Sequence, residues 1–241
     1  MCEFCFFEIK YRLRHVSTYV FAAILVSIAA LFQAAQGGAF LGFSISMSEK
    51  LFINSPRAIH AFLGFMTNLS IFMMATFIYQ MFSKDFESKF SYLLFCKPFT
   101  KAQYIFGRLM GNIIIMLGIF ALTMIVFALS VYIPGVDKEL VTSFKLYWYI
   151  EPILTTVIPN FLFISTLFIA AVIATKKTAS VFGMGFLIMI INEFSGFVGR
   201  KIEHQVLSTL IDPFGEKAFR LAMRGWSVAE MNTETIGLPY Y

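Results

Sequence analysis

The sequence predicts an all-α protein, a polytopic bundle of transmembrane helices. Of its 241 residues, 59% are hydrophobic and only 14% are charged, whereas a soluble domain carries about 25% charged residues. The mean hydropathy is +0.77. Five apolar stretches each approach or exceed the roughly 20 residues that a helix needs to cross the hydrocarbon core. Because backbone in lipid must satisfy its own hydrogen bonds, these stretches are predicted to be helices.

A short helix is predicted ahead of the first span, within residues 1–15. Its apolar residues recur on one helical stripe, namely Cys5, Phe6, Ile9 and Leu13. Glu8 and Arg12 stand four residues apart, the favourable spacing for an ion pair on a helix surface. We therefore expect an interfacial helix along the cytoplasmic leaflet. Cys2 and Cys5 form a C-x-x-C, but no second pair of ligands appears at matching spacing, so no metal site is predicted.

The predicted spans make up the transmembrane domain, residues 16–198. They cover residues 16–36, 58–82, 109–133, 149–175 and 179–198. Ser55 can cap the second span, and Pro56 suits its first turn. Pro159 interrupts the fourth span, where a proline frees a carbonyl and bends the helix.

Few polar residues fall inside the spans, and we take four as candidates for a translocation path. They are Pro159, Asn160, Asn192 and Glu193. A carboxylate inside a span is a functional candidate by default. A packing kink is the commoner explanation for such a proline, however, and Glu193 could equally reach the interface by snorkelling. Glu151, at the outer edge of the fourth span, is expected to be solvated.

The distribution of Lys and Arg predicts the orientation. One side of the predicted topology carries ten basic residues, which are Lys10, Arg12, Arg14, Lys84, Lys89, Lys97, Lys101, Arg108, Lys176 and Lys177. The loops on the opposite side carry four, Lys50, Arg57, Lys138 and Lys145. The positive-inside rule therefore places the N-terminus in the cytoplasm. Residues 199–241 then form an extracytoplasmic tail, in which Asp212 and Pro213 look like a helix start and 216–224 like a helix.

The connection between the second and third spans, residues 83–108, is amphipathic and interrupted by Pro98. A proline inside a helix costs about 3 kcal/mol or more. We therefore expect a helix, a turn at Lys97-Pro98, and a new helix capped by Thr100 that enters the third span. Gly107 and Gly111 form a G-x-x-x-G, a weak signal for close approach by another helix.

The sequence carries no motif for catalysis or for a cofactor. There is no G-x-x-x-x-G-K-[ST] loop for nucleotide phosphates, no H-E-x-x-H and no G-x-S-x-G. The net charge of +5 is assigned to the cytoplasmic face and its anionic lipid, and nucleic acid is not expected as a partner. We therefore predict no catalytic residue, no metal and no cofactor in this chain.

The chain resembles permease subunits of type-2 ABC exporters. In that family an N-terminal interfacial helix precedes six spans, and a coupling helix lies between spans two and three. The matching positions in this segment are Glu87, Leu93-Leu94, Pro98, Lys101 and Gly107-Arg108. More narrowly, the chain is similar to the N-terminal permease half of bacterial ABC permeases fused to a zinc aminopeptidase domain, through the stretches 7–14, 37–40, 54–56, 85–87, 97–108 and 212–215.

The resemblance implies a function for the cytoplasmic segment. Its residues would dock on a separate ABC ATPase that holds ATP and Mg²⁺, and the expected coupling residues are Asp85, Glu87, Tyr92, Leu93, Leu94, Lys97, Pro98, Lys101, Gly107 and Arg108. The chain would not itself be an enzyme, would pair with a second permease half, and would sit in the lipid of a bacterial inner membrane. The family's sixth span and peptidase are missing here, so a truncated chain is expected. The alternative function is a non-transporting membrane anchor or scaffold.

Overall fold

The structure is a computed structural model that describes residues 2–40, 51–87, 100–200 and 204–235, with backbone only for 83–87. All regular secondary structure in these ranges is helical. The principal helices are α1 (Cys2–Arg12), α2 (Val16–Gln36), α3 (Pro56–Glu87), α5 (Lys101–Leu129), α6 (Tyr147–Pro152), α7 (Ile158–Thr175), α8 (Ser180–Val198), α9 (Gln205–Ile211), α10 (Glu216–Ala222) and α11 (Val228–Thr233).

Five helical segments of the described chain are long and apolar enough to cross a membrane, as the sequence predicts. They are Val16–Gln36, Pro56–Phe82, Lys101–Tyr132, Tyr147–Thr175 and Ser180–Val198. The prediction of a multi-pass membrane protein is therefore confirmed by helix length and composition. The third span begins earlier than predicted, because α5 runs without a break from Lys101 into the apolar stretch.

The local signals at the helix starts are also confirmed. Thr100 caps α5 through a capping box, in which its hydroxyl accepts from the Gln103 backbone at 3.2 Å and the Gln103 side chain accepts from the Thr100 backbone at 3.2 Å. The Ser55 hydroxyl accepts a hydrogen bond of 3.3 Å from the Ala58 backbone at the start of α3. Each cap satisfies a backbone donor that the first helical turn leaves free.

The proline in the fourth span is accommodated by a change of helix type. A π-helical turn, Ile153–Val157, joins α6 to α7, and Pro159 stands in the first turn of α7. Pro159 lacks a backbone donor, and the wider π-turn lets the chain pass this position without ending the span. Glu151, expected to be solvated, is instead buried with 7% of its surface exposed.

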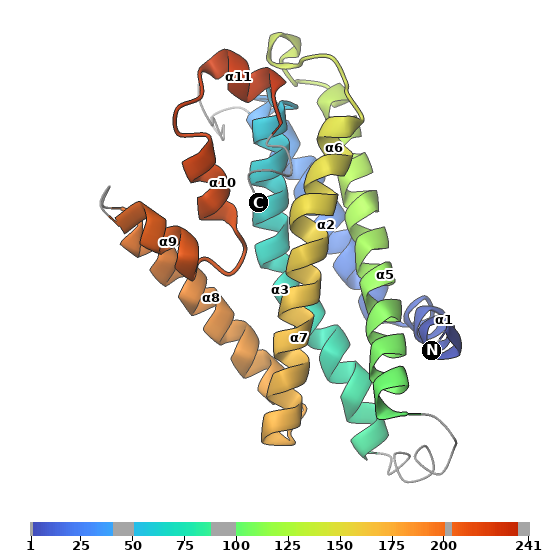
Figure 1. Ribbon diagram of the computed structural model, residues 1–241. Helices are drawn as coiled ribbons and strands as arrows, with labels where there is room; N and C mark the ends of the chain where they lie inside the picture. Colours follow the sequence, from blue (N-terminus) through green and yellow to red (C-terminus); the bar gives the residue numbers. More distant parts are fainter. Residues whose placement is uncertain (1, 41–50, 88–99, 201–203, 236–241) are drawn as a thin grey trace.

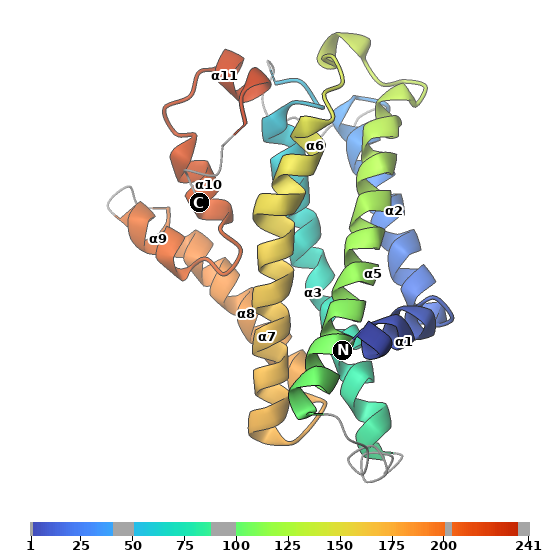
Figure 2. The same cartoon turned by 45° about the vertical axis from the view of Figure 1, so that its right-hand side comes forward.

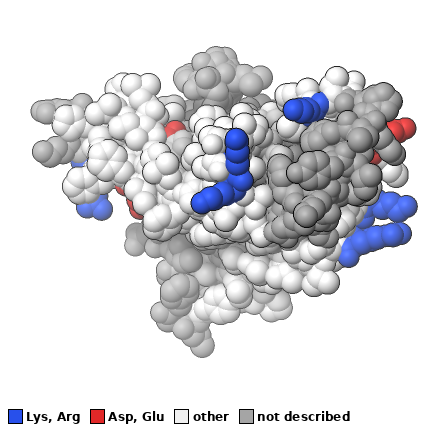
Figure 3. Space-filling model, turned by 90° about the horizontal axis from the view of Figure 1, so that it is seen from below, with Lys and Arg blue, Asp and Glu red and all other residues white. Residues whose placement is uncertain are grey.

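The long helices stand side by side, and their ends sort into two groups (Figure 1). The start of α5, the end of α3 and the turn between α7 and α8 lie at the lower end, and α1 packs across α5 in the lower part (Figure 2). The upper end holds α11 and the start of α6. The segments that carry most of the basic residues used for the orientation therefore share one end. Viewed from that end, the described surface shows more Lys and Arg than Asp and Glu (Figure 3).

The core lies between α3, α5 and α7 and combines phenylalanine with isoleucine and methionine. Phe62 stacks on Phe127 with ring centroids 4.1 Å apart, and Phe120 meets Phe161 edge-on at 4.9 Å. These four rings are fully buried. Aromatic pairs in these geometries add about 0.5–1.5 kcal/mol each to the gain from burial. Large apolar side chains also cover the outside of the bundle, as expected where lipid is the solvent.

The C-terminal segment packs back on the spans. α9 folds against α8, and α10 follows α9 towards the upper end (Figure 1). The predicted helix over 216–224 is confirmed by α10, Glu216–Ala222, whereas the helix start expected at Asp212 and Pro213 is wrong, because α10 begins at Glu216 after Gly215 with a φ of 72°. The Asp212 carboxylate instead accepts from the backbone of Phe214 at 3.0 Å and of Lys217 at 2.6 Å, which closes the turn.

Candidate functional site

α1 crosses α5 in close contact at Gly111. A Cβ atom at this position would lie 2.7 Å from the Cys5 carbonyl oxygen and 2.8 Å from the Glu8 Cβ. Only a residue without a side chain permits this approach. The second glycine of the predicted G-x-x-x-G is therefore the point where another helix approaches.

The crossing brings Glu8 of α1 between two arginines. Its carboxylate accepts from Arg12 Nε at 3.0 Å and from Arg108 Nε of α5 at 2.7 Å. Arg108 also donates to the hydroxyl of Tyr104, one turn earlier on α5. The predicted Glu8–Arg12 pair is therefore present, but Arg108 shares it and the pair is fully buried instead of lying on the surface.

Arg12 extends the contacts to α3. Its guanidinium donates to the Asn112 side chain of α5 at 2.7 Å, to the Gln80 side chain at 2.5 Å and to the Phe77 carbonyl at 2.6 Å. Its Cζ also lies 4.3 Å from the centroid of the Phe77 ring. We call Glu8, Arg12, Arg108 and Asn112 the buried ionic network.

Burying the charged groups of this network has a cost in free energy. Burial lowers the pKa of Arg12, and the neighbouring Glu8 carboxylate opposes that shift. A guanidinium nevertheless stays protonated in proteins, so the network holds two positive charges and one negative. Removing ions from water costs several kcal/mol each unless partners replace the lost hydration. The carboxylate, two amide side chains and the Phe77 carbonyl supply those partners.

The outer face of α1 is apolar. Phe6, Phe7 and Leu13 have 71%, 59% and 51% of their surface exposed. The residues of the predicted apolar stripe are divided: Phe6 and Leu13 face outward, whereas Cys5 and Ile9 are half-buried. Glu8 and Arg12 face the bundle, which is physically reasonable where the surroundings are lipid, because the ions then need the protein interior.

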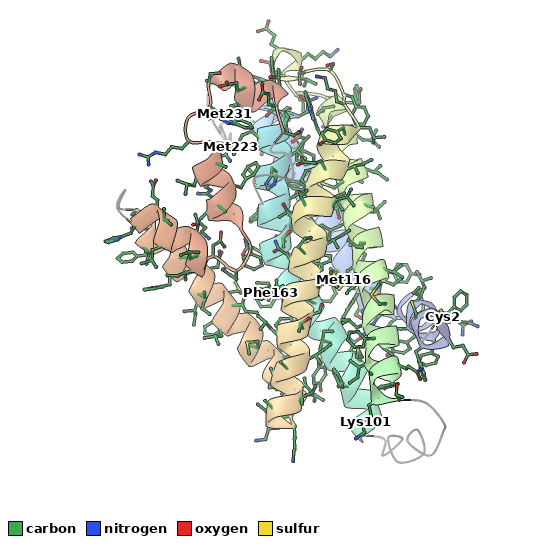
Figure 4. All side chains as sticks on the ribbon, viewed as in Figure 1. Cys2, Lys101, Met116, Phe163, Met223 and Met231 are labelled. Carbon is green, nitrogen blue, oxygen red and sulfur yellow. The ribbon has the colours of Figure 1, made fainter. Side chains whose placement is uncertain are left out.

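Beyond the network, two helices continue past the level of α1. α3 runs on from Gln80 to Glu87, and α5 begins at Lys101, before Arg108. At 1.5 Å per residue each of these ends projects by roughly 10 Å. Lys101 lies at the lower end, below the level of Cys2 (Figure 4). The projecting ends flank residues 88–99.

The predicted coupling residues are distributed over this region. Tyr92, Leu93, Leu94, Lys97 and Pro98 lie outside the described residues. Asp85 and Glu87 are in the last turns of α3, and their side chains also lie outside the description. Lys101 is exposed in the first turn of α5, whereas Gly107 and Arg108 are buried.

Arg108 therefore differs in exposure from Lys101, another of the predicted coupling residues. Only 5% of Arg108 is exposed, and its guanidinium is directed at Glu8 and Tyr104. Arg108 therefore stabilises the packing of α5 against α1, and its charge is not accessible to a partner in water. Sequence reasoning missed this role because Glu8 and Arg108 stand 100 residues apart, and only the Glu8–Arg12 spacing and Gly111 hinted at it.

The translocation-path candidates divide into two buried and two exposed residues. Asn160 donates to the Phe214 carbonyl at 3.0 Å. Asn192 donates to Asn68 at 3.1 Å and accepts from Lys217. Pro159 and Glu193 are exposed on the outside of the bundle. The two asparagines therefore attach the C-terminal segment to the spans, and the structure does not bring the four residues together.

In the described ranges, no three or more His, Cys, Asp or Glu side chains form a group that could hold a metal ion. Cys2 is exposed and Cys5 is partly buried, both as free thiols.

Comparisons of the chain with protein-family models, with curated proteins and with solved structures found no match.

Proposed function

We propose that this chain is the transmembrane permease subunit of an ABC-type exporter in a bacterial inner membrane. A separate cytoplasmic subunit would bind ATP and Mg²⁺ and hydrolyse ATP, and segment 83–108 would receive its motion. The buried ionic network carries the proposal, because it ties α1, α3 and α5 together where α3 and α5 leave the bundle towards this segment. The motif order of the segment, which resembles type-2 ABC exporters, supports the same assignment.

The network makes the two flanks of the segment move as one unit. The single side chain of Arg12 donates hydrogen bonds both to Phe77 of α3 and to Asn112 of α5. Pulling these helices apart would leave buried charges without partners, at a cost of several kcal/mol per ion. A force on the projecting ends is therefore transmitted into the bundle instead of bending one helix.

α1 would anchor the joined ends of α3 and α5 at the membrane surface. Its exposed Phe6, Phe7 and Leu13 suit the acyl boundary, and exposed Lys10 and Arg14 suit an anionic headgroup layer. In this arrangement the N-terminus is cytoplasmic, and the projecting ends of α3 and α5 reach into the cytoplasm.

The solute path would lie between this chain and a second permease half, either another copy or a related chain. Asn160 and Asn192 contact Phe214 and Lys217 of the C-terminal segment. These contacts would have to break before either asparagine could face a solute. Opening the path on this side is therefore coupled to movement of residues 212–217.

The same two contacts favour a second candidate, a non-transporting membrane anchor. A scaffold needs its spans packed and its C-terminal segment held in place, and the contacts of Asn160 and Asn192 achieve this. An anchor needs no ATP-hydrolysing partner, so the two functions predict different outcomes of one experiment.

Co-purification decides between them. We expect the tagged full chain, extracted mildly from its host, to bring down an ATP-hydrolysing subunit whose activity it stimulates in lipid. Leu93→Asp and Lys97→Glu should each reduce association or stimulation at least several-fold, whereas Lys177→Glu, at the exposed turn between α7 and α8, should not. Recovery of a well-folded chain with no ATPase, or full activity of both segment variants, would rule the permease proposal out.

A further inference from the structure

A basic crevice lies at the end of α8, between α8, α9 and α10, on the half of the molecule opposite α1. It encloses about 250 Å³. Its lining includes Gly199, Gln205, Ser208, Lys217, Arg220 and Arg224. Among the described residues that line it, three are positively charged and none is negatively charged.

The three cations stand on one face of α10 and of the turn that follows it. Lys217, Arg220 and Arg224 are separated by three and four residues. Like charges at these spacings repel by a few tenths of a kcal/mol per pair. A helix that places three of them along one cavity is favourable chiefly when an anion joins them.

The partners within the protein balance only part of this charge. Lys217 Nζ lies 3.6 Å from Asp212, and Arg220 pairs with Glu216. Arg224 donates to the neutral Gln205 side chain at 2.7 Å. Among the described residues, three cations thus meet two carboxylates, and the hydrogen bond of Arg224 to the neutral Gln205 side chain leaves its charge unbalanced there.

The opposite wall of the crevice is held in place by close helix packing. The Ser195 hydroxyl donates to the Ser208 carbonyl and the Ser208 hydroxyl to the Ser195 carbonyl, each at 2.7 Å. A Cβ atom on Gly199 would lie 2.5 Å from the Ser208 hydroxyl. α9 is therefore fixed against α8 at a defined distance from the basic face of α10.

The surface beside the crevice is apolar. Phe197 of α8 and Val206 and Leu210 of α9 have 64%, 63% and 79% of their surface exposed. α8 has 19 residues and is therefore about 28 Å long, close to the thickness of the hydrocarbon core. A crevice at the end of such a helix can meet lipid headgroups, with acyl chains beside the helix.

We propose that this crevice binds the phosphate of an anionic phospholipid, whose acyl chains lie along the exposed faces of α8 and α9. Arginine donors match phosphate oxygens in geometry and charge, and Arg220 and Arg224 supply them here. The site is independent of the transport function proposed above, because it requires only that the chain be in a membrane.

The test uses the purified full chain in detergent, with lipid binding followed by native mass spectrometry. The probes are phosphatidylglycerol, phosphatidylcholine and inorganic phosphate. We expect phosphatidylglycerol to bind and Arg224→Glu to weaken this binding roughly fivefold or more, since each basic residue near anionic lipid contributes about a factor of five. Lys177→Glu changes the charge equally at a distant exposed site and is the matched control.

Each other outcome overturns the proposal. Equal weakening by Arg224→Glu and Lys177→Glu would show general attraction to the basic chain, and unchanged binding in both would exclude the crevice. Displacement of phosphatidylglycerol by millimolar phosphate would indicate a site for a free anion. Equal binding of phosphatidylcholine would show no preference for anionic lipid. Arg224→Gln, milder at an exposed position, gives the same readout if the charge reversal disturbs folding.

Discussion

The carboxylate of Glu8 on α1 accepts a hydrogen bond of 2.7 Å from Arg108 on α5, so a residue near the N-terminus is ionically paired at the entry to the third span. Both side chains are almost completely buried. Arg12 adds a second positive charge to the same carboxylate and connects it to α3. The end of the bundle that bears the basic residues is therefore held together by one buried anion.

Replacing Glu8 should destabilise the protein strongly. In Glu8→Gln, Arg12 and Arg108 stay buried without a counter-charge, and losing one partner of a buried pair costs about 3–5 kcal/mol. For a chain of this size we expect the melting temperature to fall by roughly 6 °C or more. Thermal unfolding in detergent measures it. Glu3→Gln, on the exposed part of the same helix, should change it by less than about 1 °C, and an equal effect of both variants would contradict the network.

A side chain at Gly111 should push α1 away from α5. In Gly111→Ala the new methyl group would lie 2.7 Å from the Cys5 carbonyl, and overpacking of this kind costs about 1–3 kcal/mol. Gly118→Ala, on the same helix with nothing within 4 Å of its Cβ position, should be neutral or slightly stabilising because alanine favours helix. Thermal unfolding of the two variants side by side checks this. Equal stability would show that α1 does not pack at Gly111.

The C-terminal segment should loosen when Asn192 is lost. Asn192→Leu removes the side-chain oxygen that accepts from Lys217 and the amide that donates to Asn68. Trypsin should then cut at residues 217–224 several-fold faster, since the segment opens more often. Glu193→Gln, the exposed neighbour, is the control. Unchanged cleavage of Asn192→Leu would mean that the segment is held by other contacts.

The capping box of α11 leads to a prediction about the pKa of Glu230. Hydrogen bonds from the Ser227 backbone and then from the Ser227 hydroxyl lower the pKa of Glu230. A carboxylate whose pKa is depressed by folding stabilises the folded state above its unfolded value, near 4.3, and this contribution disappears as the pH falls through the folded pKa. An NMR titration should show a lower pKa for Glu230 in the native chain than in Ser227→Ala. Identical titration curves would show that the Ser227 hydroxyl does not bond to the Glu230 carboxylate in solution.

The spans and caps could be predicted because their causes are local. Hydropathy over about 20 residues determines a span, and Ser55 and Thr100 cap through backbone donors within three residues. The burial of Glu8 and Arg12 could not be predicted in this way. A stripe of apolar residues indicates which side of α1 avoids water, but it does not show that the ion pair on the same helix lies against α5.

Contacts between distant residues and local changes of helix type could not be predicted from a single sequence. The pairing of Glu8 with Arg108 depends on how α1 crosses α5, and the weak glycine signal at Gly111 could not identify its partner helix. Pro159 predicted a disturbance in the fourth span but not its form, a π-turn from Ile153 to Val157. The helix start expected at Asp212 and Pro213 was wrong because a turn separates Asp212 from α10, and the Asp212 carboxylate reaches across this turn to the Lys217 backbone in the first turn of α10.

ATP hydrolysis by the proposed ATPase partner, measured with the chain reconstituted in lipid, tests the proposed transmission of motion most directly. The comparison uses the native chain, Glu8→Gln, the charge swap Glu8→Arg with Arg108→Glu, and Glu3→Gln. The account predicts that Glu8→Gln keeps the partner bound but loses most of the stimulation, that the swap recovers part of it, and that Glu3→Gln matches the native chain. Full stimulation by Glu8→Gln, with the partner still bound, would contradict the claim that the buried ionic network transmits the motion.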